Sequence, residues 1–164
     1  MEEYKSLVDK KNYVSKARFD TEYNICKEIM VASKNMLDYV YSLFPDKTLE
    51  SIYGQSVDQN SIKENASLKV AEKIKAFEDL LEGNSPFIPQ EVYEEFNELK
   101  GMCQANLFSY QCSDVENPFY NSVSDKDREQ LISDAYDRTQ EIVNRMNTIA
   151  SMLRQHFQNM DIQN

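Results

Sequence analysis

A wide apolar stripe between Ser15 and Phe44 constrains the fold of this chain more than any other feature. Its members recur at spacings that alternate between four and three residues, which is the pattern of one helix face: Phe19, Tyr23, Cys26, Met30, Ser33, Leu37, Val40 and Phe44. Four further residues widen the same side: Ile25, Ile29, Met36 and Leu43. Because this stripe is wider than the seam of a two-stranded coiled coil, we expect a helix with at least two neighbours.

Four helices are predicted along the chain, over residues 2–44, 61–82, 89–112 and 125–159. Pro45 disfavours helical geometry at the residue before it, so the first helix should end at Phe44. Pro89 suits the first turn of the third helix. Ser124 followed by Asp127 resembles a capping box at the start of the fourth helix, although Glu or Gln is usual at the later position.

The lengths of these helices predict how they pack. The first and last are long, and the two between them are shorter. Moderate connections make successive helices neighbours, so we expect an antiparallel up-down-up-down four-helix bundle. The chain of 164 residues contains only 3 Gly and 4 Pro. It therefore fits a single all-α domain, 1–164, better than a turn-rich sandwich or barrel.

Charge and cysteine content limit the possible partners and the compartment. The chain has 28 acidic and 18 basic residues, a net charge of −10, which opposes binding to nucleic acid. It contains no apolar run long enough for a membrane span. The three cysteines, Cys26, Cys103 and Cys112, lack paired spacing. We expect reduced thiols in the core of a cytoplasmic protein, rather than disulfides or a metal or redox site.

The sequence lacks the catalytic motifs that are common in helical bundles. The single histidine, His156, has Leu153 three residues before it, so the Glu-x-x-His pair of di-metal bundles is absent. Helical nucleases with Arg four to six spacers before His would need Arg at 149–151, where this chain has Ile, Ala and Ser. We expect no catalytic residue, no cofactor and no metal, and therefore not an enzyme.

One run near the start resembles a known group of proteins. The run has the order aromatic, Ser, basic, Arg-Phe-Asp, Glu-aromatic: Tyr13, Ser15, Lys16, Arg18, Phe19, Asp20, Glu22 and Tyr23. It resembles a group of uncharacterised bacterial proteins, and the stretch Phe87, Ile88, Pro89, Glu91, Tyr93 is similar to a second shared piece. In that group the run often follows an N-terminal membrane helix, and no activity is established. This chain lacks the helix, so the resemblance implies either a soluble member or one whose tether precedes the chain.

Acidic and aromatic side chains form a candidate partner surface. Helical spacing places four carboxylates on one side of the third helix: Glu91, Glu94, Glu95 and Glu98. Like charges four residues apart do not favour a helix, so this stripe is either a solvated face or a docking surface for a basic protein. Phe119 and Tyr120 follow in an acidic loop. They form either a lid over the bundle end or a recognition tip.

A charged layer is predicted where the first helix meets the last. Glu22 lies on the core side of its helix, and a partly buried carboxylate requires a partner. Antiparallel packing brings Arg154 and His156 near it, with Arg18 and Asp20 in the same layer. We interpret this layer as a structural ion pair of Glu22 or Asp20 with Arg154, in which His156 can also take part, rather than as a ligand site.

Two hypotheses about function follow. The first is a non-enzymatic helical-bundle interaction domain of an uncharacterised bacterial protein, cytoplasmic and held at the inner membrane face if a tether precedes this chain. The second is an acidic inhibitor, such as an immunity protein or antitoxin, that covers a basic toxin surface.

Overall fold

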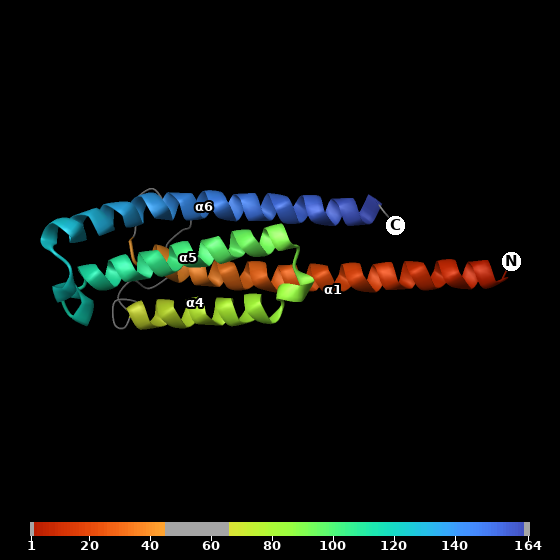
Figure 1. Cartoon of the computed structure of the whole chain (residues 1–164), viewed down its shortest axis with the longest axis horizontal. Coiled ribbons are helices and arrows are strands. Elements are labelled where there is room, and N and C mark those ends of the chain that lie inside the picture. The colour runs from red at the N-terminus through yellow and green to blue at the C-terminus, as the bar shows by residue number, and fades with distance from the viewer. Residues whose placement is uncertain (1, 45–65, 163–164) are drawn as a thin grey trace.

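The structure, a computed structural model, describes residues 2–44 and 66–162 and consists there of helices. Its four α-helices are α1 (Glu2–Tyr41), α4 (Ala66–Gly83), α5 (Gln90–Ser113) and α6 (Asp125–Ile162). Two short 3-10 helices, η1 (Ser85–Phe87) and η2 (Pro118–Ser122), lie in the connections. Successive α-helices run in opposite directions (Figure 1), so the predicted all-α up-down-up-down bundle is confirmed.

Helix α1 ends three residues earlier than predicted. The last turn tightens, because the amides of Ser42 and Leu43 donate to the carbonyls of Tyr39 and Val40, three residues back. The Ser42 hydroxyl also donates to the Tyr39 carbonyl at 2.6 Å. Phe44 remains buried in the core although it is no longer helical. The predicted start of the second helix at 61–65 lies outside the described residues.

The starts of the later helices follow the sequence signals. Pro89 stands at the N-cap of α5. The Ser124 hydroxyl accepts from the Asp127 amide at 3.3 Å, which is the first of the two bonds of a capping box. The same hydroxyl donates to Asp127 Oδ2 at 2.6 Å. Asp127 therefore contacts the hydroxyl of Ser124, whereas the usual Glu accepts from the backbone amide of the capping residue.

The core lies between the four helices, and its centre is a pair of buried rings. Phe77 of α4 and Phe96 of α5 meet edge to face with centroids 5.8 Å apart. Helices α5 and α6 share a buried polar contact as well, from Asn106 Nδ2 to Thr139 Oγ1 at 3.0 Å. Helices α1 and α6 make a sparser contact than α1 with α4, α4 with α5 or α5 with α6, which leaves the α1–α6 seam open.

The long helices extend beyond the short ones. Both α1 and α6 continue past η1, where the chain turns from α4 into α5 (Figure 1). In this part of the molecule neither α4 nor α5 covers them, and α1 projects furthest. Within the described ranges, every helix falls short of the length and apolarity that a membrane crossing requires.

Candidate functional site

The open seam contains a groove of about 620 Å³ between α1 and α6. Seven apolar or sulfur-containing side chains line it: Phe19, Tyr23, Cys26 and Met30 from α1, and Ala150, Leu153 and Phe157 from α6. Cys26 and Leu153 are buried, whereas Tyr23 is 47% exposed. The groove therefore has a core-like floor and solvent-exposed aromatic walls.

Three rings hold one wall of the groove together. Phe19 and Tyr23 lie nearly parallel, with an interplanar angle of 7° and centroids 6.1 Å apart. Phe157 meets both rings edge on, at 5.7 Å from Phe19 and 5.4 Å from Tyr23. Edge-to-face pairs of this kind add about 0.5–1.5 kcal/mol beyond burial. The rings thus join α1 to α6 while part of their surface stays open to a ligand.

The charges around the groove are basic, in contrast to the molecule as a whole. Lys27 and Arg154 line it, and among the side chains that the structure describes no carboxylate does. Both side chains are exposed. With a net charge of −10 on the chain, this edge is a local basic site on an acidic protein. It favours a ligand that combines apolar surface with negative charge.

A charged cluster supports the α1–α6 contact in the same stretch. Arg18 Nε donates to Glu22 Oε1 at 2.6 Å, and His156 Nε2 lies 3.0 Å from Glu22 Oε2. Burial raises the pKa of Glu22, but the bonds from Arg18 and His156 outweigh it and hold this pKa below its usual value. An ionised carboxylate can only accept, so Nε2 of His156 carries the donated proton.

The predicted pairing of Arg154 is replaced by one with His156. Among the described residues, Glu22 bonds to Arg18 and His156, and Arg154 lies exposed at the groove instead. The reason is register, since residues 154 and 156 differ by about 200° around α6. Asp20 is exposed and lies outside the cluster. The layer joins α1 to α6 through His156, which belonged to the predicted layer, and without Arg154.

The predicted partner surface separates into parts with different environments. Within the acidic stripe, Arg145 of α6 contacts Glu95 at 2.7 Å and Glu98 at 2.5 Å. Glu94 accepts from Gln90 at 2.8 Å, and Glu91 is exposed. Two of the four carboxylates are therefore paired within the molecule, and they share one guanidinium. The other half keeps its charge at the N-terminal end of α5.

The two loop aromatics lie at the other end of α5 and take different roles. The Tyr120 ring packs on the Arg128 guanidinium, 3.7 Å from its carbon to the ring centroid. Phe119 is 49% exposed and contacts the equally open Phe108 of α5, with ring centroids 6.2 Å apart. Tyr120 thus closes the loop against the bundle, and Phe119 faces solvent.

The cysteines have the environment of core residues. Burial, with a contribution from Glu22, raises the pKa of Cys26 to about 11, and burial raises that of Cys103 to about 12. Cys112 is also buried and free, with its pKa raised by burial. Thiols in this state are poor nucleophiles at neutral pH. In the described part of the chain, no group of three or more His, Cys, Asp or Glu is arranged to hold a metal ion.

The sequence contains a signal for the groove that the stripe alone did not reveal. Phe19 and Tyr23 belong to the apolar stripe predicted as core. The helices predicted between the long pair are too short to cover both ends of that stripe.

Comparison with protein-family models, with curated proteins and with solved structures finds no match for this chain.

Proposed function

We propose that this chain is a helical-bundle protein-interaction domain without enzymatic activity, and that its groove binds an amphipathic helix of a partner protein. The observation that carries the proposal is the apolar groove along the α1–α6 seam, with its exposed aromatic wall. Helix-in-groove recognition uses apolar anchors spaced one turn apart against a surface of this kind. Aromatic side chains at such a site are frequent sources of binding energy.

The groove defines the chemistry of the partner helix. From Phe19 to Met30, α1 rises by about 16 Å, which matches about three turns of a docked helix. Lys27 and Arg154 favour acidic residues beside the apolar anchors. The partner segment is therefore an acidic amphipathic helix of about three turns. On the resemblance of the Tyr13 to Tyr23 run, we assign the protein to the bacterial cytoplasm, at the inner membrane face where a tether precedes the chain.

A model helix tests this proposal directly. The probe is a fluorescent peptide with Leu at spacings of three and four residues and Glu at most other positions, and anisotropy gives its affinity. We expect Lys27→Glu with Arg154→Glu to weaken binding at least about tenfold, because attraction becomes repulsion. Tyr23→Ser should weaken it by a similar factor through the lost aromatic anchor.

The control makes the same change of net charge elsewhere. Lys34 and Lys126 are exposed and lie outside the groove lining. Lys34→Glu with Lys126→Glu should leave the affinity within about twofold, after screening at physiological ionic strength. Equal losses in both double variants would mean that the peptide senses net charge alone, which would refute the groove as its site.

A second candidate function is an acidic inhibitor of a basic protein, such as an immunity protein or antitoxin. The net charge of −10 and the free carboxylate of Glu91 beside Glu94 favour it. Reversal of Glu95 or Glu98 would also break the contacts to Arg145, so Glu91→Lys with Glu94→Lys is the cleaner variant. An inhibitor of this kind should lose affinity for its basic target in that variant, and unchanged affinity would exclude this surface.

A further inference from the structure

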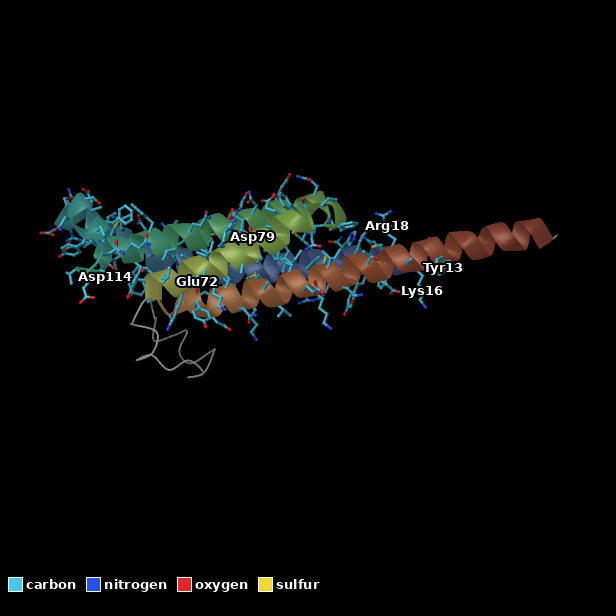
Figure 2. The ribbon with its side chains drawn as sticks, turned by 90° about the horizontal axis from the view of Figure 1, so that it is seen from below. Tyr13, Lys16, Arg18, Glu72, Asp79 and Asp114 are labelled. Carbon is cyan, nitrogen blue, oxygen red and sulfur yellow. The ribbon has the colours of Figure 1, made fainter. Side chains whose placement is uncertain are left out.

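A second exposed apolar surface lies at the opposite end of the bundle from the groove. We call it the tip and define it by Phe108 of α5 and by Val115 and Phe119 of the following loop. Their exposed fractions are 46%, 71% and 49%, and the two rings contact each other. Figure 2 shows Asp114 of this loop far from Arg18, where α1 leaves the bundle. The tip and the groove are therefore separate surfaces.

Arg128 of α6 fixes the backbone of the tip through hydrogen bonds. Its Nε donates to the Cys112 carbonyl at 3.0 Å, and Nη2 donates to the carbonyls of Tyr120 and Val123 at 2.8 and 3.0 Å. Nη1 contacts Asp125 at 2.5 Å. One guanidinium thus joins the end of α5, the loop and the start of α6.

Local caps fix the loop further. The Glu116 amide donates to Asp114 Oδ1 and the Phe119 amide to Asn117 Oδ1, each at 3.1 Å. The Ser122 hydroxyl donates to the Phe119 carbonyl at 2.6 Å. Because the backbone on both sides of Phe119 is bonded, docking would order little additional chain. A preorganised surface loses less entropy on binding.

The charges around the tip determine which partner fits it. Asp114 and Glu116 stand in the loop, which has no basic residue between Ser113 and Ser124. The nearest base along the chain on the α6 side, Lys126, is flanked by Asp125 and Asp127. The guanidinium of Arg128 is occupied by its carbonyls and Asp125. Exposed apolar side chains could also enter a membrane, but these acids repel an anionic lipid surface.

We propose that the tip is a docking surface for a basic protein segment, with Phe119 as its apolar anchor and Asp114 and Glu116 as its charged rim. The basic segment carries an apolar side chain that covers the two rings, between Lys or Arg residues that meet the carboxylates. This surface is separate from the groove. It is also separate from the Glu91 to Glu98 stripe, because the stripe lies in the N-terminal half of α5 and the tip lies at the C-terminal end. The chain can then hold two partners of opposite charge at its two ends.

A matched pair of peptides tests the tip. One is an amphipathic helix of Leu and Lys, and the other has Glu at every Lys position. The full chain, labelled with ¹⁵N, is titrated with each, and amide shifts locate the contact. We expect the Lys peptide to shift the amides of Phe108 and of residues 114–119. The Glu peptide should leave these amides unchanged.

Two variants and a control distinguish binding at the tip from nonspecific attraction of a basic peptide to an acidic protein. Phe119→Ser should weaken the Lys peptide about tenfold, and Glu116→Lys should weaken it several-fold with a smaller dependence on salt. Leu68→Ser removes an apolar side chain of α4 that is 58% exposed and should have no effect. Three results would overturn the proposal. The amide shifts could centre on Glu91 and Glu94, the Leu68 variant could lose as much affinity as the Phe119 variant, or the chain could co-sediment with anionic vesicles. Failure of the Glu peptide to bind the groove would refute the proposed function and leave the tip unaffected.

Discussion

Glu22 is a buried carboxylate that joins α1 to α6. It is 8% exposed, and it bonds to Arg18 of its own helix and His156 of α6. Its pKa is lower in the folded chain than in the unfolded one, so its ionised form stabilises the fold. That stabilisation is fully present above the unfolded pKa and is lost as the pH falls through the folded pKa.

Glu22→Gln should reduce the free energy of unfolding by about 1–2 kcal/mol at pH 7, because a charge-assisted bond between helices is lost. Urea denaturation at several pH values measures this. The difference from the natural chain should shrink below about pH 4, where glutamate protonates in the unfolded state. Asp20→Asn is the control, since Asp20 is exposed, and it should change stability by less than about 0.5 kcal/mol. A difference independent of pH would contradict the ionic role of Glu22.

The buried contact between α5 and α6 shows how one pair of helices is fixed in register. Asn106 Nδ2 donates to Thr139 Oγ1, Arg138 Nη1 donates to Asn106 Oδ1 at 2.8 Å, and the Thr139 hydroxyl donates to the Ala135 carbonyl at 2.7 Å. Asn106 and Thr139 are fully buried. A buried polar network stabilises one arrangement only when each member has its partner.

Thr139→Val keeps the shape of the side chain and removes the acceptor of Asn106. We expect it to lower the free energy of unfolding by about 1–3 kcal/mol, since a buried amide donor is left without a partner. Thr148→Val is the matched control on the same helix, because the hydroxyl of Thr148 is exposed and bonds to the Asn144 carbonyl of its own helix. It should change stability by less than about 0.5 kcal/mol. Equal effects of the two substitutions in thermal or urea unfolding would refute the role of the buried pair.

Element types and boundaries were largely predictable because local signals determine them. Ser124 with Asp127 predicted the start of α6, and Pro89 that of α5. Register between distant helices has no local signal. Arg154 and His156 both lie near the end of a long helix, and packing, rather than spacing, decides that His156 meets Glu22. The pairing of Arg145 with Glu95 and Glu98 has the same origin.

At the scale of the whole molecule, unequal helix lengths produce the candidate site. The apolar stripe of α1 predicted a core, and over most of α1 this prediction is confirmed by buried residues such as Ile29 and Met36. Beyond η1 the same stripe has no cover from α4 or α5 (Figure 1). Tyr23, a member of this stripe, is partly exposed and forms a wall of the groove. Periodicity predicts which face is apolar, but the three-dimensional extent of the neighbours decides whether that face is buried.

Across the whole molecule, the distribution of charge makes the two ends of the bundle favour ligands of opposite charge. Lys27 and Arg154 make the groove basic, while Asp114 and Glu116 make the tip acidic. Both ends carry aromatic side chains that are partly exposed. The two proposed surfaces therefore lie apart along the bundle, with α5 running most of the way between them.

The central claim is that the groove between α1 and α6 binds an acidic amphipathic helix, and amide shift mapping tests it most directly. The full chain, labelled with ¹⁵N, is titrated with the Leu and Glu peptide at physiological ionic strength. The account predicts shifts concentrated in residues 19–30 of α1 and 150–158 of α6, and their loss when Lys27 and Arg154 are both replaced by Glu. Shifts spread over the surface, shifts centred elsewhere, or no shifts at all would contradict it.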